Sequence, residues 1–154
     1  MKTVTPLKRS KELQPLSRDH HHALLLCWKI KTGFSKGVAA ERIRNYAVWF
    51  YQQHLLPHFE LEEKHIFPLL GSEHESVIRA LSEHRQLEDL FKEPGVEASR
   101  LEEWSALLEQ HIRFEERVLF SEVQQIATPE QLSLISALHG EEHFEENLQD
   151  VFWE

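Results

Sequence analysis

Two stretches of this chain, HFELEEKHIF at residues 58–67 and HIRFEERVLF at residues 111–120, repeat one arrangement of side chains. In each stretch a Glu follows the His by four residues, a second Glu comes next, and a Phe stands five residues after the first Glu. Positions four apart on an α-helix differ by about 40° around the axis, so each His and its Glu share one face. The repeat therefore predicts two helices that each carry a His-Glu pair on one side.

Helical patterning covers most of the chain, in five segments joined by short connections. This pattern favours an all-α fold, an up-down-up-down four-helix bundle with an additional C-terminal helix. At 154 residues the chain is expected to form a single domain, 1–154, with a ligand-bearing core at about 16–123. The expected helices cover about 17–33, 39–70, 72–92, 99–126 and, for the extra helix, 129–151.

Polar residues that can cap a helix mark where several of these segments begin. Ser17, Ser72 and Ser99 are candidate caps, and Thr128 with Gln131 forms a capping box around a Pro at the first helical position. Inside the second segment, Pro57 removes a backbone donor just before the first His-Glu pair. It predicts either a kink or a helix that starts anew at that residue.

The two His-Glu pairs lie on stripes that are otherwise apolar. One stripe holds Ala47, Phe50, His58, Leu61 and Glu62, and the other holds Trp104, Leu108, His111, Glu115 and Val118. Burying a carboxylate with an imidazole is unfavourable unless something compensates for the lost hydration. A metal ion compensates for both groups, because it accepts a neutral imidazole nitrogen and a carboxylate oxygen together.

The first and third segments each add one inward His. LSRDHHHALL at 16–25 resembles LSEHRQLEDL at 81–90, and helical phase places His20 and His84 on the apolar faces. The chain order is then His, His-x-x-x-Glu, His, His-x-x-x-Glu. Six inward ligands are too many for one zinc ion, and the duplication indicates two metals that share the carboxylates.

Composition narrows the possible partners. The net charge of −9 leaves no basic stripe for phosphates, so we expect no nucleic-acid partner. No apolar run is long enough for a membrane span, and the first residues carry no apolar signal core. A single Cys excludes an internal disulfide and suits a reducing compartment, so we expect a cytoplasmic protein without a membrane partner.

This ordered set of motifs resembles the hemerythrin-like family, whose domains are named for their His-His-Glu cation-binding motifs. The resemblance rests on His20, the stretch 58–68, His84 and the stretch 111–120. It implies a four-helix bundle with a non-haem di-iron centre that binds dioxygen or a related small oxidant. It also implies that His20, His58, His84 and His111 are terminal ligands and that Glu62 and Glu115 bridge the irons.

The chain differs from the oxygen-carrying members of that family in two respects. Carriers have a second His four residues from the third-helix ligand, where this chain has Ala80 and Glu88, and their last ligand is an Asp five residues after the final His. Here Glu115 stands at four residues and Glu116 at five. A more acidic ligand set favours a sensor or a redox enzyme over a reversible carrier.

Several alternatives stay open at this point. Manganese or a mixed pair could replace iron, and the protein could be an enzyme acting on peroxide or nitric oxide, or one that handles iron for iron-sulfur repair. A metal-free helical interaction module would use the same His as buried polar residues. We expect His22 to be solvated, and His139 and His143, with Glu142 and Glu146, to lie on a solvated surface helix. His54 stands one turn before His58 on the same face, so it could serve as a fifth His, but packing near Tyr51 is favoured, and His65 is a weaker case of the same kind.

Overall fold

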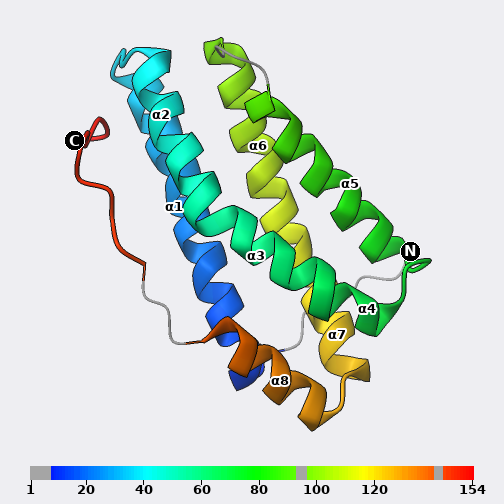
Figure 1. Cartoon of the computed structure of the whole chain (residues 1–154). Helices are drawn as coiled ribbons and strands as arrows, with labels where there is room; N and C mark the ends of the chain where they lie inside the picture. Colours follow the sequence, from blue (N-terminus) through cyan, green and yellow to red (C-terminus); the bar gives the residue numbers. More distant parts are fainter. Residues whose placement is uncertain (1–7, 93–96, 141–143) are drawn as a thin grey trace.

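The computed structural model describes residues 8–92, 97–140 and 144–154, and these residues contain helices and no strands (Figure 1). Two of the four long helices are α1 (Gln14–Ser35), which follows the short η1 (Lys11–Leu13), and α5 (Glu75–Asp89), which continues into η4 (Leu90–Lys92). The second long helix contains α2 (Ala40–Phe50), α3 (Leu56–Leu61) and α4 (Phe67–Leu70), and the fourth contains α6 (Ala98–Phe114) and α7 (Phe120–Ile126). With α8 (Pro129–His139), they form the predicted all-α bundle with an extra helix. None of the described helices combines the length and apolarity that a membrane crossing requires.

Wider π-helical turns join the pieces of the second and fourth helices: η2 (Tyr51–Leu55), η3 (Glu62–Ile66) and η5 (Glu115–Leu119). After each of these turns the backbone N–H reaches back five residues, from Phe67 to the carbonyl of Glu62 and from Phe120 to that of Glu115. Pro57 and Pro68 follow η2 and η3, so a wider turn there accommodates the missing N–H. The second helix therefore continues through Pro57 and does not start anew.

The capping predictions had mixed outcomes. Thr128 and Gln131 form the predicted capping box, because each side chain accepts a hydrogen bond from the other residue's backbone N–H. The helices expected to start at Ser17, Ser72 and Ser99 start instead at Gln14, Glu75 and Ala98. Before α5, the imidazole of His74 accepts a hydrogen bond from the backbone N–H of Ser76, so His74 caps this helix in place of Ser72.

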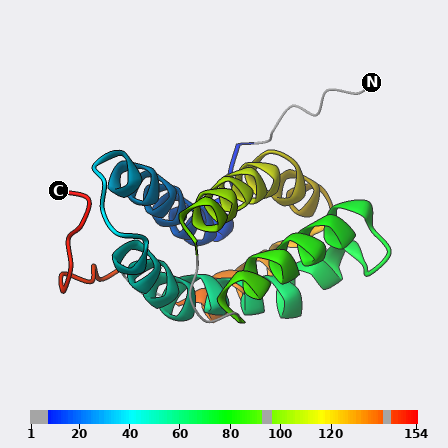
Figure 2. The same cartoon turned by 90° about the horizontal axis from the view of Figure 1, so that it is seen from above.

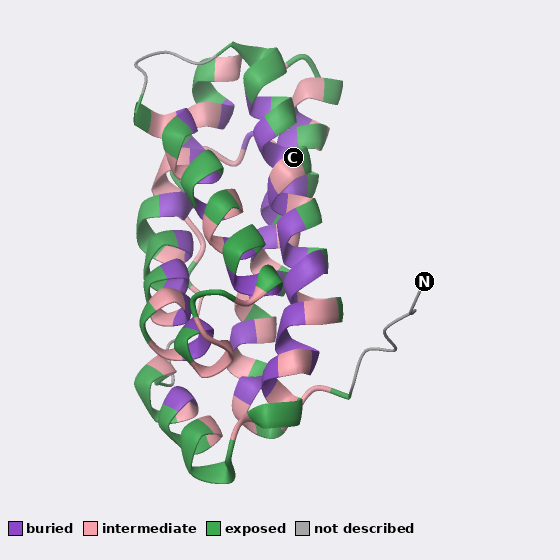
Figure 3. Cartoon of the chain, turned by 90° about the vertical axis from the view of Figure 1, so that its right-hand side faces the viewer, coloured by how far each residue is buried: buried purple, intermediate pink, exposed green. Residues whose placement is uncertain are grey.

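Buried residues recur along the inner faces of the helices (Figure 3), and the apolar ones separate into two clusters. The first includes Leu26, Ile30, Ile43, Phe50, Leu87, Trp104 and Leu108, and the second includes Leu13, Leu16, Ile66, Val77, Phe114, Phe120 and Ile135. On every long helix the predicted metal ligands fall between residues of the first cluster and residues of the second. The polar centre thus lies between two layers of apolar packing that hold the helices in place.

The extra helix is shorter than predicted. We expected it to reach about residue 151, but α8 ends at His139 because Gly140 adopts a positive φ of 73°, which breaks the helical path. Residues 144–154 are not helical, and they run back beside α1 and α2 (Figures 1 and 2). A helix-terminating Gly followed by a returning segment replaces the long surface helix.

Three contacts fasten this returning segment to the bundle. Phe152 is buried against Gly33 of α1, where an added Cβ would lie only 2.8 Å from the Phe152 ring. The buried Lys29 ammonium lies 2.5 Å from the Glu146 carboxylate. Arg42 donates two hydrogen bonds to Asp150 at the surface. The segment is therefore part of the packed fold and covers the ends of α1 and α2.

Candidate metal centre

Each long helix sends one or two polar side chains into the layer between the two apolar clusters. These side chains are His20 of α1, His58 of α3, Glu62 at the start of η3, His84 of α5, His111 of α6 and Glu115 at the start of η5. Their exposed fractions range from 0 to 4%. The structure thus brings together the six residues that the sequence predicts as ligands, and it starts a π-helical turn at both carboxylates.

The six side chains form two overlapping groups. One contains His20, His58, Glu62 and Glu115, and the other contains Glu62, His84, His111 and Glu115. Within each group the potential ligand atoms all lie within 4.8 Å of one another. Because both carboxylates belong to both groups, two cations held side by side would share them.

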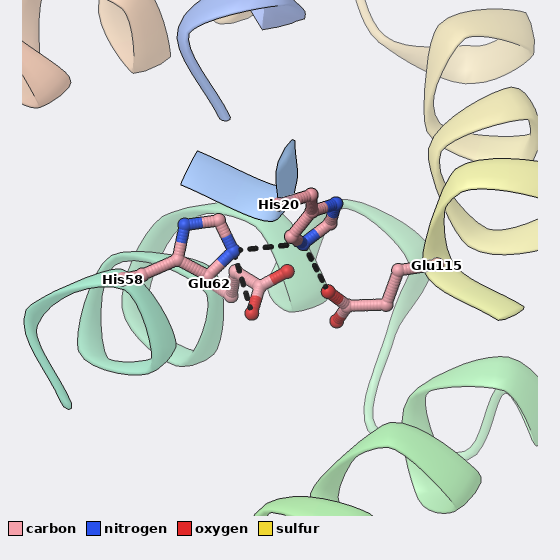
Figure 4. Close-up of side chains that lie close together, drawn as sticks. All are labelled: His20, His58, Glu62 and Glu115. Atoms are coloured by element: carbon pink, nitrogen blue, oxygen red, sulfur yellow. Dashed lines mark hydrogen bonds and ion pairs between the residues drawn. The ribbon is translucent and has the colours of Figure 1, made fainter. Parts of the chain in front are cut away.

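The first group is drawn in Figure 4, where the two imidazoles and two carboxylates point toward one another. His20 Nε2 lies 3.0 Å from His58 Nε2 and 2.9 Å from Glu115 Oε1. Glu62 Oε1 lies 3.4 Å from His58 Nε2. Every atom that faces the centre of this half can therefore bind a cation.

The second group repeats this geometry with the other two helices. His84 Nε2 lies 3.1 Å from His111 Nε2 and 3.4 Å from Glu62 Oε1. Glu115 Oε2 lies 3.4 Å from His111 Nε2. The internal duplication seen in the sequence therefore appears in space as two matching halves.

A carboxylate also lies near the outer nitrogen of each of the four imidazoles. His58 Nδ1 lies 2.9 Å from Asp19, and His84 Nδ1 lies 2.8 Å from Glu63. His111 Nδ1 lies 2.8 Å from Glu83, and His20 Nδ1 lies 3.6 Å from Glu116. A carboxylate accepts a hydrogen bond, so it favours a proton on Nδ1 and leaves the Nε2 lone pair facing inward. Two inward lone pairs about 3 Å apart need a proton or a metal ion between them.

These outer carboxylates follow the same duplication. Asp19 and Glu83 each precede an inward His by one residue, and they contact the inward His of the next helix, His58 and His111. Glu63 and Glu116 each follow an inward Glu by one residue, and they contact His84 and His20 of other helices. Every long helix therefore orients an imidazole that a different helix carries. The centre depends on all four helices being packed together.

Charge within the centre is balanced by protons when no metal is bound. Burial and repulsion from Glu115 raise the pKa of Glu62. Burial acts on Glu115 in the same direction, but His111 outweighs it and holds the pKa of Glu115 well below its ordinary value. Burial would lower the pKa of His111, but Glu115 outweighs it and raises that pKa to about 10. Metal binding is expected to displace these protons.

The residues present fit a pair of cations. Neither oxygen of Glu62, nor Oε2 of Glu115, has a hydrogen-bond partner among the described residues, although all three atoms are buried. A buried carboxylate oxygen without a partner is unfavourable, and a metal ion is the partner that this arrangement can accept. Mixed imidazole and carboxylate donors suit first-row transition metals.

The other histidines among the described residues lie outside the two groups, and two of them differ from expectation. His54 contacts Trp49, Phe50 and Phe144, so it stays near the centre without joining it. His22 is half-buried and stacks on Phe144, although we expected it to be solvated. His143 and Glu142 lie outside the described residues.

His139 was expected to face solvent, and this prediction was wrong. Only 11% of its side chain is exposed, and its Nε2 lies 2.7 Å from Asp19 Oδ2, the same oxygen that His58 contacts. Asp19 and Glu83 were not predicted as orienting residues. A signal for them was present, because an acid precedes the inward His in both copies of the Leu-Ser repeat.

Comparison with known proteins agrees with this geometry. The family model described as the hemerythrin HHE cation binding domain matches residues 12–123, most of the chain. No curated protein and no solved structure matches the chain significantly. The matched region contains all six predicted ligands, and it ends before α8. From its motifs, its helical bundle and this match, the chain belongs to the hemerythrin HHE cation-binding family.

Proposed function

We propose that this protein binds two iron ions between its four long helices and uses them to bind or sense dioxygen or a related small oxidant. The observation that carries the proposal is the pair of overlapping four-residue groups that share Glu62 and Glu115. In this arrangement Glu62 and Glu115 would hold both metals, and each pair of His would hold one of them. Two ferrous ions would supply two electrons to a small oxidant.

The ligand set supports iron better than zinc. A single zinc ion is satisfied by three or four protein ligands, whereas six converge here. Imidazole and carboxylate donors accept iron, and also the neighbouring ion manganese, so a manganese or mixed pair is the nearest competing composition. A metal-free interaction module would leave the buried oxygens of Glu62 without a partner.

Aromatic rings wall the centre against water. Phe59 stacks on the His84 ring with centroids 3.8 Å apart, and Phe120 stacks on His20 at 5.2 Å. A groove of about 1940 Å³ is lined in part by His20 and His58. A small oxidant could reach the His20–His58 half through this groove, while the stacked rings hold the imidazoles in place.

The acidic surroundings of the imidazoles favour sensing or redox chemistry over reversible carriage. A carboxylate that accepts from the outer N–H of a ligating imidazole makes that imidazole more basic and stabilises the more highly charged metal. Three of the four imidazoles have such a contact at 2.8 to 2.9 Å. We therefore expect oxidation in air to be retained once it has occurred.

Elemental analysis and spectroscopy test this proposal. After anaerobic loading with ferrous iron, the protein should retain about two iron atoms per chain, and its visible charge-transfer spectrum should change in air and not return under argon. One zinc with no uptake of iron would contradict the di-iron centre. Full return under argon without reductant would support a reversible carrier instead.

A redox enzyme is the second candidate, and the groove beside His20 and His58 is the observation that favours it. If oxidation in air is retained, anaerobic mixing of the ferrous protein with hydrogen peroxide or nitric oxide separates the two roles. An enzyme should consume many equivalents when a reductant is present. A sensor should react once per centre and then stop.

A further inference from the structure

The four outer carboxylates of the centre are each paired with a cation, and one pairing differs from the others. Arginines pair with three of them: Arg9 with Glu116 at 3.6 Å, Arg85 with Glu63 at 2.8 Å and Arg79 with Glu83 at 3.3 Å. Asp19 instead pairs with the imidazole of His139, at 2.7 Å. In the other half, Arg79 pairs with Glu83, the residue that corresponds to Asp19 in the duplication. The duplication therefore predicts an arginine beside Asp19, where the chain has a histidine from another helix.

The surroundings of His139 favour its cationic form. Nε2 faces the carboxylate of Asp19, and Nδ1 lies 3.1 Å from the backbone carbonyl oxygen of Gly140. Both neighbours are hydrogen-bond acceptors, so both ring nitrogens must donate to satisfy them. The imidazole therefore acts on Asp19 as an arginine does in the other three pairs. It lies on α8, a short helix that contacts η1 and α1.

The helix that carries His139 is attached to the bundle by one face. Ile135, four residues before His139 on the same face, is buried in the cluster that includes Leu13 and Leu16. The hydrogen bond from His139 to Asp19 therefore forms when this face of α8 is docked on η1 and α1. Asp19 then accepts from the Nδ1–H of His58, so one oxygen joins α8 to an inward imidazole.

We propose that α8 acts as a clamp on the His20–His58 half of the centre: His139 holds Asp19, and Asp19 holds His58 in its metal-binding orientation. His139 and Asp19 are positioning residues in this proposal, which rests on the proposed metal centre. Metal in this half is then retained best while α8 is docked. By reciprocity, metal binding must stabilise the docked position of α8 by the same factor.

Metal release to a chelator tests the clamp. Loss of an outer-shell partner typically weakens metal binding by about 10- to 100-fold, so His139→Gln should speed release of one of the two metal ions by about tenfold or more. Arg79→Gln is the matched control, because it removes the corresponding cation from Glu83 beside His111 in the other half. It should speed release of the other ion, and the double variant should speed both.

Two further measurements separate positioning from simple damage to the fold. His139→Arg places the cation type of the other three pairs on α8 and should restore slow release. Amide hydrogen exchange in α8 should slow by about tenfold on metal loading of the wild-type protein and should not change in Asp19→Ala, because the reciprocal factor is lost.

The outcomes distinguish failure of the clamp from failure of the metal centre. A wild-type chain that retains two metal ions, with release unchanged in His139→Gln, would refute the clamp and leave the centre intact. Failure of His139→Arg to restore slow release would also overturn the clamp, because the loss would then be structural. A wild-type chain that retains no metal would overturn both.

Discussion

Replacing Glu62 with Gln should change stability in opposite directions in the metal-free and metal-loaded proteins. In the metal-free protein this buried carboxylate has no hydrogen-bond partner among the described residues, and burial and Glu115 raise its pKa from 4.5 to about 8. In the metal-loaded protein the same group is proposed to bridge both ions. The substitution therefore removes a source of instability in one state and a ligand in the other.

The magnitude follows from the pKa values. At pH 7 the folded protein keeps the Glu62 proton that the unfolded chain has already released, and this difference favours unfolding by about 3 kcal/mol. The penalty is absent below about pH 4.5, grows as the pH rises, and is complete above about pH 8. Gln cannot ionise in either state, so the metal-free Glu62→Gln protein should gain up to about 3 kcal/mol at pH 7 and almost nothing near pH 4.5.

Urea unfolding of the two proteins measures this difference. With a slope of about 2 kcal/mol/M, the midpoint of the metal-free variant should rise by roughly 1.5 M at pH 7. After anaerobic loading with ferrous iron the order should reverse, because the wild-type protein gains the free energy of metal binding and the variant lacks a bridging ligand.

Glu63→Gln is a matched control at the neighbouring residue. His84, and then Arg85, lowers the pKa of Glu63 to about 2, so its charge stabilises the fold above about pH 4.5 and this stability is lost as the pH falls. The control should therefore lower the midpoint of the metal-free protein at pH 7. A lower midpoint for metal-free Glu62→Gln at pH 7 would refute the reasoning, because it would show that the Glu62 charge is already compensated.

Other substitutions test the ligand assignment and the packing of the C-terminal segment. His58→Ala and His111→Ala should each lower iron content strongly by elemental analysis, whereas His22→Ala, which removes an imidazole stacked on Phe144, should leave it unchanged; equal loss in all three would show that the inward ligands were chosen wrongly. Gly33→Ala should lower the melting temperature through the clash with Phe152 at 2.8 Å, by about 1–3 kcal/mol of stability, and an unchanged melting temperature would mean that residues 144–154 do not pack there in solution.

The sequence alone was sufficient to identify which side chains lie on the inner face of each helix. Residues four apart on a helix share a side whatever surrounds them, so His58 and Glu62 had to project together, as did His111 and Glu115. Adding His20 and His84 to the apolar stripes of their helices was enough to predict which six side chains meet. Their assignment as ligands stays a prediction, and the family match supports cation binding by the chain as a whole.

Helix ends were less predictable than helix faces. The capping box at Thr128 was readable because both partners lie within one turn of the chain. The end of α8 at Gly140 was missed, because HGEEHFEEN continues the polar pattern of a surface helix and local spacing does not show that the chain turns back there. The turn allows Phe152 to pack against Gly33, which stabilises it, and those two residues are far apart in the sequence.

Tertiary structure alone decided which groups orient the imidazoles. The contacts from Asp19 to His58, from Glu83 to His111 and from Glu63 to His84 each join two helices, so they depend on helix crossing and register, which periodicity within one helix does not contain. The same holds for His139, whose hydrogen bond to Asp19 spans 120 residues of sequence. Local periodicity determined which side chains face inward, and the packing of separate helices determined the partner of each one.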